Sequence, residues 1–255
     1  MKTAENKKRF AYLEYGLILL VFAVCLTGAI LIPMEQCPDE QGRLILTEWI
    51  AKNGALPTGN EGEVMIPGWG YSYAIYPCLS SIVGAVFMKA AMAFTASNVA
   101  YLAAARLCSV LSITGCCCFC LLIGRMVFEK RSSTLLFATL VCFLPQVMFL
   151  GMYHNNDSLS LLAVSMMLYY IVNGFERKYP VRSCIGLALA LSVGLLSYYT
   201  IYGWLLMGAL FWVVAVLKDP EISRGGGGNP QTRSFDRGYL PASCGLVLPS
   251  QRHSP

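Results

Sequence analysis

The sequence predicts an all-α protein, a polytopic transmembrane helix bundle with an amphipathic juxtamembrane helix in its first outer loop. Hydrophobic residues make up 56% of the 255 residues, and charged residues only 13%, against about 25% in soluble domains. The mean hydropathy is +0.57. The apolar residues form long runs, and the basic residues stand in short clusters beside them. That placement indicates membrane topology, so we expect no nucleic-acid partner despite the net charge of +5.

The first apolar run, about residues 15–33, is long enough to cross a bilayer, and no small-residue cleavage site follows it. We therefore expect a retained signal-anchor helix. Four basic residues stand among the first nine, and basic flanks stay in the cytoplasm. A multi-pass protein of the cell membrane with a cytoplasmic amino terminus is predicted. Glu14, near the inner end of the run, is expected to snorkel to the interface.

Residues 35–70 form the first outer loop, a polar stretch with six acidic and two basic residues. Its net negative charge suits the extracytoplasmic side. Within it, Asp39 is placed to N-cap a short helix that Gly54 and Pro57 end. One side of this helix is apolar, and the other is expected to carry Arg43, Thr47, Glu48 and Lys52. An amphipathic helix of this kind lies flat in the interface, where it would hold Asp39 and Glu40 at the bilayer surface.

Six further apolar segments follow, at about residues 71–94, 104–128, 135–152, 159–172, 184–199 and 202–217. Basic clusters after the second and fourth of these segments mark cytoplasmic ends. With the amino terminus also in the cytoplasm, two crossings must lead to the first basic cluster, but three apolar segments precede it. We expect residues 71–94, which contain Pro77, not to cross fully and to form a re-entrant or outer helix packed against protein. Lys89 argues for the opposite assignment. Pro145 is expected to kink its outward-running helix.

This topology places Asp39 and Asp157 on the same outer face. Asp157 ends the polar stretch His154-Asn155-Asn156-Asp157, which interrupts the apolar sequence. A carboxylate at a membrane boundary is costly unless it is paired or functional, so the two acids are candidates for chemistry. Each is also placed to be a helix N-cap, a role that does not exclude catalysis. His154 is expected to be an interfacial hydrogen-bond partner rather than a ligand.

The eleven cysteines do not indicate a disulfide scaffold. A group of them lies inside an apolar helix, where packing by small polarizable residues is favoured over metal or redox chemistry; these are Cys116, Cys117, Cys118 and Cys120. Cys37 and Cys78 are both placed outside the cytoplasm, and a bridge between them stays open as an alternative.

The composition changes abruptly at about residue 219. The following sequence, with four consecutive glycines at 225–228, is rich in Arg, Ser, Pro and Gly and contains no segment that could span a membrane. The chain is therefore divided into a transmembrane module, residues 1–218, and a tail, residues 219–255. The tail is expected to be disordered, or an aberrant end such as a frame shift or truncation.

Several landmarks together resemble the amino-terminal module of the GT-C integral-membrane glycosyltransferases. The likeness is closest to the protein O-mannosyltransferase and aminoarabinose-transferase-like branch. The landmarks are Pro38-Asp39-Glu40, residues 49–57, Tyr71-Ser72-Tyr73, Arg106, and Pro145 ahead of Asn155-Asn156-Asp157. They span about residues 10–218, and their order and spacing are more specific than any one of them. Family members are considerably longer, so the likeness covers only their front half.

The resemblance implies an enzyme that moves a sugar from a polyprenyl-phosphate-linked donor to a protein, lipid or glycan acceptor on the extracytoplasmic face. It implies that Asp39 is the catalytic carboxylate of the first loop, with Glu40 as its neighbour and Asp157 as the second-loop acid. Many relatives have His where this chain has Arg43, so donor or acceptor binding can differ in detail. The weaker candidates for contacts to the donor phosphate or the acceptor are Arg43, Lys52, His154 and Asn156.

Glycosyl transfer requires a base near the acceptor and stabilisation of a charged transition state. Partial desolvation at a membrane boundary makes a carboxylate a stronger base. The phosphate leaving group needs a cation, supplied by Arg43, by Lys52 or by a divalent metal ion between Asp39 and Asp157; no cofactor is certain. Two other interpretations remain, a transporter or channel half whose acids are ion sites, and an inactive membrane fragment.

Overall fold

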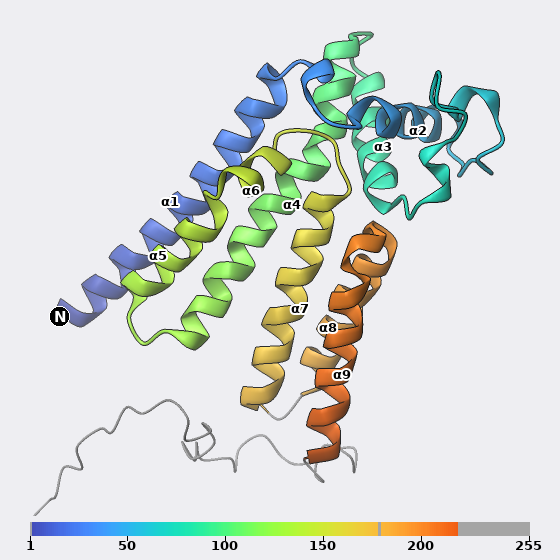
Figure 1. Ribbon diagram of the computed structural model, residues 1–255. Helices are drawn as coiled ribbons and strands as arrows, with labels where there is room; N and C mark the ends of the chain where they lie inside the picture. The colour runs from blue at the N-terminus through green and yellow to red at the C-terminus, as the bar shows by residue number, and fades with distance from the viewer. Residues whose placement is uncertain (1, 178–179, 219–255) are drawn as a thin grey trace, which may run out of the picture.

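The computed structural model describes residues 2–177 and 180–218, and the predicted tail at residues 219–255 lies outside this part of the chain. All regular structure in the described residues is helical, which confirms the all-α prediction (Figure 1). The α-helices are α1 (Lys2–Leu31), α2 (Glu40–Asn53), α3 (Leu79–Met92), α4 (Asn98–Val127), α5 (Arg131–Cys142), α6 (Pro145–Leu150), α7 (Asp157–Arg177), α8 (Val181–Ser197) and α9 (Tyr202–Lys218). The short 3₁₀ helices are η1 (Met34–Gln36), η2 (Gly62–Val64), η3 (Tyr73–Ile75) and η4 (Tyr199–Ile201).

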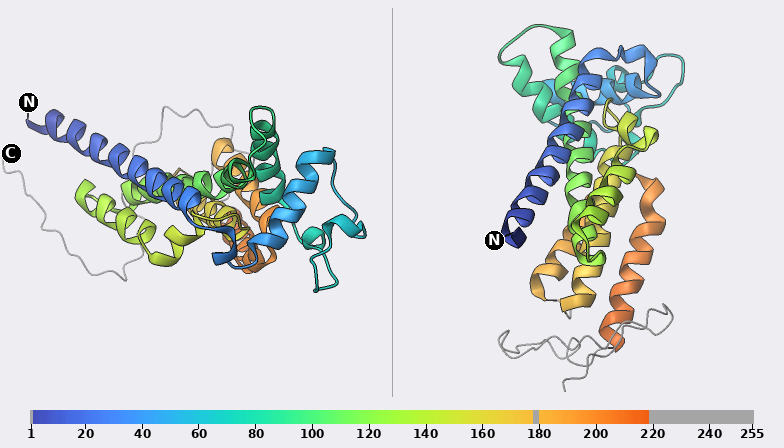
Figure 2. Two further views of the ribbon diagram at one scale, coloured as in Figure 1. Left: turned by 90° about the horizontal axis from the view of Figure 1, so that it is seen from above. Right: turned by 90° about the vertical axis from the view of Figure 1, so that its left-hand side faces the viewer.

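In the described part of the chain, three helical segments are long and apolar enough to cross a membrane, namely Phe10–Leu31, Asn98–Val127 and Asp157–Phe175. α4 occupies the middle of the bundle, because it packs against α1, α3, α5 and α7. Seen from above, α1 and α5 lie on one side of the bundle, and the connection between α2 and α3 projects from the other (Figure 2). The exposed apolar side chains of α8 and α9 are consistent with contact to lipid.

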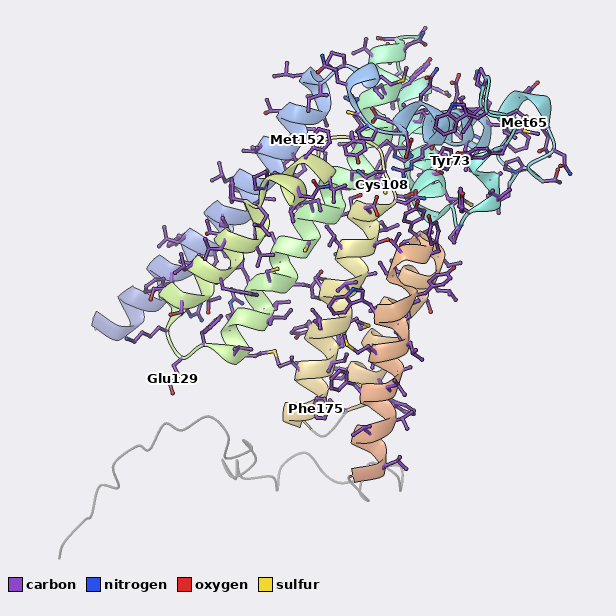
Figure 3. The ribbon with its side chains drawn as sticks, in the orientation of Figure 1. Met65, Tyr73, Cys108, Glu129, Met152 and Phe175 are labelled. Atoms are coloured by element: carbon purple, nitrogen blue, oxygen red, sulfur yellow. The ribbon has the colours of Figure 1, made fainter. Side chains whose placement is uncertain are left out.

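The two ends of the bundle differ in character. α1 ends, and α4, α7 and α9 begin, at the end that carries α2 and α3; we call this the loop end (Figure 1). α4 ends and α5 begins at the opposite end, which we call the basic end because Arg125 and Arg131 lie there. Tyr73 lies at the loop end and Glu129 at the basic end (Figure 3).

α2 begins and ends where the sequence predicts. Asp39 is the residue before the helix, and Gly54 follows it in the left-handed conformation with φ 66°, which glycine adopts without strain. The predicted division into an apolar and a solvated face is wrong at two positions. Arg43 and Thr47 are buried, with 5% and 0% of their surface exposed, because other parts of the chain cover the side of α2 that was expected to face water.

The predicted segment at residues 71–94 is only partly helical. Only Leu79–Met92 is α-helical, a length of about 21 Å at 1.5 Å per residue, against about 30 Å for the hydrocarbon core of a bilayer. α3 packs against α2 and α4 at the loop end. This length and position favour the prediction that the segment does not cross completely.

Proline 145 interrupts its helix fully. The predicted outward segment divides into α5 and α6, and Pro145 occupies the first turn of α6. A proline lacks the N–H that would continue the preceding helix, and it is favoured at a helix start. The predicted kink is therefore a complete break, and it turns the chain toward the polar stretch ahead of α7.

Glu14 does not snorkel to the interface as expected. Its side chain is 1% exposed and forms ion pairs with Arg125 of α4 and Arg131 of α5. The Arg131 Nη1 to Glu14 Oε1 distance is 3.3 Å. A charge inside an apolar bundle needs such a partner, so Glu14 joins α1, α4 and α5 at the basic end.

The cysteines of α4 are packing residues. Cys116, Cys117 and Cys120 are buried in a core formed by α1, α4 and α5, together with Cys142. These thiols are free, as the apolar setting of the segment predicts. Cys37 and Cys78 are also free and are not joined to one another.

Candidate functional site

An ion pair between Glu40 and Arg106 organises the loop end. Glu40 is the first residue of α2, and Arg106 lies nine residues into α4. Arg106 Nε donates to Glu40 Oε1 at 2.8 Å, and Arg106 Nη2 donates to Glu40 Oε2 at 2.6 Å. Both side chains are 0% exposed. A guanidinium matches a carboxylate in this two-point geometry, so the pair fixes the start of α2 against α4.

The same pair fixes two further segments. Arg106 Nη1 donates to the carbonyl oxygens of Ala29 at 2.8 Å and Ile32 at 2.6 Å, at the end of α1. Glu40 Oε1 also accepts from the backbone N–H of His154 at 2.6 Å. The first outer loop and the polar stretch before α7 therefore meet, as the topology argument requires. The Glu40 carboxylate has three donors in this arrangement, which suits a positioning role better than proton transfer.

His154 is a buried partner of α2. Its side chain is 0% exposed, and its Nε2 lies 2.9 Å from Thr47 Oγ1. Thr47 donates its own proton to the carbonyl oxygen of Arg43 at 2.9 Å, so His154 Nε2 is the donor to Thr47. Burial lowers the pKa of His154 to about 3, with the Arg43 charge as the next cause. His154 is thus the neutral hydrogen-bond partner that the sequence suggests, although it is internal rather than interfacial.

The two asparagines hold the start of α7. Asn155 Oδ1 accepts from the N–H of Ser158 at 2.7 Å, which is the bond of a helix cap. Asn156 Oδ1 accepts from the Ser80 hydroxyl of α3, and Asn156 is 3% exposed. Asn156 therefore has a structural partner. Asn155, two residues before Asp157, therefore supplies the capping bond that was considered for Asp157.

Asp39 has an unusual backbone. Its φ is 55°, which makes it the one non-glycine residue with a positive φ in the described part of the chain. Such conformations cluster at functional sites. The residue precedes α2, but its side chain makes no capping hydrogen bond, and it is exposed. The Asp39 carboxylate is therefore not engaged by the helix that follows it.

Tyr73, the first residue of η3, packs beside α2 at the loop end (Figure 3). Burial raises the pKa of Tyr73 to about 12, and the Asp39 carboxylate contributes through its charge and a hydrogen bond. The Arg43 charge acts in the opposite direction. Asp39 and Arg43 therefore flank the same phenol.

Arg43 is a buried cation whose charge acts on both Tyr73 and Asp157. Its guanidinium forms no ion pair and no hydrogen bond within residues 2–177 and 180–218, and its Nε is fully enclosed. Two tyrosine rings cover it, with its Cζ 5.6 Å from the ring centre of Tyr73 and 5.9 Å from that of Tyr198. Contacts of this kind replace only part of the hydration that a buried charge loses.

Asp157 lies at the other side of the same cluster. It is the first residue of α7, it is partly buried, and it has no ion pair among the described residues. Burial raises the pKa of Tyr153. The positive charge of Arg43 lowers this pKa, and the negative charge of Asp157 raises it. Arg43 and Asp157 therefore lie within electrostatic reach of one phenol, and the site runs from Asp39 through Arg43 to Asp157.

Lys52 is separate from this cluster. It is nine residues beyond Arg43 on α2, about 13 Å along the helix axis. Its Nζ pairs with Glu48 Oε1 at 2.6 Å, and both side chains are largely exposed. The structure therefore brings together every candidate residue except Lys52.

A divalent metal ion would find few ligands at this site. Among the described residues, no group of three or more His, Cys, Asp or Glu side chains is placed to hold a metal. Asp39 and Asp157 are two carboxylates, and Mg²⁺ is commonly bound by one or two carboxylates with water and substrate phosphate. Asp39 and Asp157 therefore fit a divalent metal ion only if a substrate phosphate and water supply its other ligands.

Sequence reasoning gave no role to three residues of the site. Arg106 was a landmark only, yet an arginine inside a 30-residue apolar helix must have a partner, and that signal could have identified the pair with Glu40. Tyr73 also belongs to one of the landmarks, but neither it nor Tyr198 carries such a signal, because tyrosines are frequent throughout this chain. Only the fold shows that they enclose Arg43.

Comparison with known proteins gives a family. The sequence model of a family described as "Predicted membrane protein (DUF2142)" matches residues 60–248, well over half of the chain. The chain belongs to this family. It is accordingly a membrane protein, and the matched range contains Arg106 and Asp157 but begins after Asp39, Glu40 and Arg43. No curated protein and no solved structure shows significant similarity to it.

Proposed function

We propose that the loop end of this membrane protein transfers a sugar from a polyprenyl-phosphate-linked donor to an acceptor on the extracytoplasmic face. The observation that carries the proposal is the grouping of two carboxylates, Asp39 and Asp157, around the cation Arg43, none of which forms an ion pair within residues 2–177 and 180–218. A base, a carboxylate that stabilises the charged transition state and a cation for the phosphate are the groups that this transfer requires. The resemblance to the amino-terminal module of GT-C enzymes supports the same reaction.

Asp39 is the general base of this proposal. Its exposed carboxylate accepts the proton of the acceptor group while that group forms a bond to the anomeric carbon of the sugar. The bond from the anomeric carbon to the phosphate oxygen breaks, and polyprenyl phosphate leaves with the bonding electrons. Asp157 stabilises the positive charge that develops on the sugar ring. Arg43 is the cation available to the phosphate or to the acceptor.

Glu40 has a different role in this proposal. It accepts three hydrogen bonds, two from Arg106 and one from the His154 backbone, so it has little capacity for proton transfer. It acts as a positioning residue that holds the Asp39 and Asp157 segments together. The membrane sidedness follows from the basic clusters, with the loop end outside and the amino terminus in the cytoplasm.

The proposal is tested with the full chain reconstituted in liposomes. Polyprenyl monophosphates carrying different sugars are supplied, and release of sugar-free polyprenyl phosphate is measured. We expect release with at least one donor, and a loss of at least about 100-fold in Asp157→Asn, within the range of a catalytic carboxylate. Glu48→Gln, an exposed carboxylate on α2, serves as the control and should retain wild-type release.

Two outcomes would contradict the proposal. Movement of a solute across the liposome membrane without consumption of the donor would favour a transporter. An ion-driven movement that requires Asp157 would favour it as well. Equal release by Asp157→Asn and wild type would show that the Asp157 carboxylate takes no part in the reaction. In either case the charged residues grouped at the loop end would have a function other than sugar transfer.

A further inference from the structure

We propose that the basic end binds an anionic phospholipid of the cytoplasmic leaflet. The lipid phosphate lies on Arg125 and Arg131, and the acyl chains lie along α5. This site is at the opposite end of the bundle from the residues proposed for sugar transfer (Figure 1), and it does not depend on the proposed function.

One buried carboxylate positions two arginines from different helices. Glu14 of α1 is almost completely enclosed, and it accepts hydrogen bonds from Arg125 near the end of α4 and from Arg131 at the start of α5. Arg125 Nε lies 3.3 Å from Glu14 Oε1, and Arg131 Nη1 lies 3.3 and 3.4 Å from the two carboxylate oxygens. The two guanidinium groups are therefore held close together at a point where three helices meet.

Both arginines keep donors for a further partner. Arg125 uses Nε and Nη2 on Glu14, and Arg131 uses Nη1 alone, among the contacts of the described residues. The two side chains are 40% and 39% exposed, and none of the remaining donors of Arg131 is enclosed. A guanidinium holds its N–H donors in a fixed plane that phosphate oxygens match in two-point contacts. The free donors therefore suit a phosphate group.

The charge of this group favours one anion. Residues 125–131 contain three basic residues and one acidic residue, and Glu14 adds a second acid, so the net charge is +1. One lipid phosphate balances that charge. Basic pockets between membrane helices on the cytoplasmic side bind anionic lipid head groups, and the basic clusters of this chain place the basic end on that side.

An exposed apolar stripe continues from the charged group along α5. Leu136, Leu140 and Phe143 follow Ser132 at intervals of four, four and three residues, which places them on one side of the helix. All three apolar side chains are exposed, and Ser132 is next to Arg131. Polar and apolar contacts therefore follow each other in the order of a phospholipid, head group first and acyl chains after it. A soluble anion would use the arginines but not the stripe.

The experiment measures lipid binding to the full chain by native mass spectrometry from a nonionic detergent. Two of the probes, dioleoylphosphatidylglycerol and dioleoylphosphatidylcholine, have the same acyl chains and differ in head-group charge. The third, inorganic phosphate, is added as a competitor. We expect phosphatidylglycerol to bind at least about tenfold more tightly than phosphatidylcholine, and inorganic phosphate at the concentration of the lipid not to displace it. This comparison uses the wild-type chain and needs no variant.

Three variants test where the lipid binds. Arg131→Gln leaves Arg125 on Glu14, and Arg125→Gln leaves Arg131 there, so the buried carboxylate keeps one partner in each. Each variant should lose about fivefold in affinity for phosphatidylglycerol and little for phosphatidylcholine. Arg182→Gln is the matched control, because it removes an exposed arginine from the start of α8, which α4 and α7 separate from α5 (Figure 1). It should leave both affinities unchanged.

Three results would overturn this assignment. Equal affinity for the two lipids would show that the head-group charge is not recognised. Displacement of phosphatidylglycerol by an equal concentration of inorganic phosphate would make the ligand a soluble anion. An equal loss of affinity in Arg131→Gln and Arg182→Gln would show a general effect of surface charge rather than a site at Glu14.

Discussion

Asp39 and Glu40 are adjacent in the chain, yet the structure gives them opposite environments. Asp39 is exposed, has a positive φ and caps nothing. Glu40 is fully buried and accepts three hydrogen bonds. The sequence indicated the acidic pair as the place for chemistry, and the resemblance ranked Asp39 ahead of Glu40, but neither indicated that Glu40 is buried in an ion pair. The difference depends on Arg106, which is 66 residues away from Glu40 and meets it only in the folded bundle.

The burial of His154 predicts how stability depends on pH. The pKa of His154 is about 3 in the folded chain, against 6.5 for an ordinary histidine. Between these values the unfolded chain binds a proton that the folded chain does not. Stability from this residue is therefore complete above about pH 6.5 and is lost as the pH falls toward 3, by up to about 1.4 kcal/mol per pH unit.

The measurement is the free energy of unfolding of the detergent-purified chain between pH 7.5 and 4.5, for wild type and His154→Gln. Glutamine retains a hydrogen-bonding group toward Thr47 but does not titrate in this range. We expect a shallower decline in the variant than in wild type. If the free energy of unfolding depended on pH equally in both chains, the pKa of His154 would be the same in the folded and unfolded chain, and the residue would not be buried as described.

Close packing of α3 provides a prediction for that helix. A Cβ on Gly84 would lie 2.9 Å from His154 Cε1 and 3.3 Å from the Ala105 carbonyl oxygen. Neither neighbour is the free end of a flexible side chain, so Gly84→Ala should destabilise the chain by about 1–3 kcal/mol. Gly62→Ala is the matched control, because nothing lies within 4 Å of its Cβ. Chemical denaturation of both variants tests this, and an unchanged Gly84→Ala would mean that α3 sits farther from His154.

The helices could be predicted from sequence to different degrees. Gly54 gave the end of α2, and Pro145 gave the break between α5 and α6, because glycine and proline act locally on the backbone. The start of α2 follows Asp39 as predicted, although Asp39 makes no capping hydrogen bond. The faces of α2 could not be predicted. Periodicity divides a helix into an apolar and a polar side, but it does not show that protein covers both sides, as it does at Arg43 and Thr47.

For the molecule as a whole, the structure groups the candidate residues at one end, and the side of the membrane follows from the positive-inside rule. Labelling by a membrane-impermeant maleimide tests this in intact cells. Single cysteines at Asn60 and Ser97, both exposed, should react from outside, while one at Ser132 should react only after permeabilisation. The wild-type chain supplies the background of its own cysteines. Opposite sides for Asn60 and Ser97 would mean that α3 crosses completely, and the parity argument would be wrong.

Only part of this arrangement could be inferred in advance. The apolar runs and basic clusters gave a helical membrane bundle with both acidic stretches on one side, because these signals depend on composition. The contacts among Tyr73, Arg43 and Tyr198 join α2, η3 and the end of α8. These contacts depend on how the helices pack, and the spacing of residues in the sequence does not indicate that packing.

The most direct test of the account is the rate of sugar release from a polyprenyl-phosphate donor by folded Asp39→Asn and Glu40→Gln chains. Asparagine tolerates the left-handed backbone of position 39, so Asp39→Asn should melt like wild type and lose release by at least about 100-fold. Glu40→Gln should lose about 3–5 kcal/mol of stability, because Arg106 becomes an unpaired buried charge, while its folded fraction keeps measurable release. Wild-type release by a stably folded Asp39→Asn chain would contradict the central claim that this carboxylate is the base.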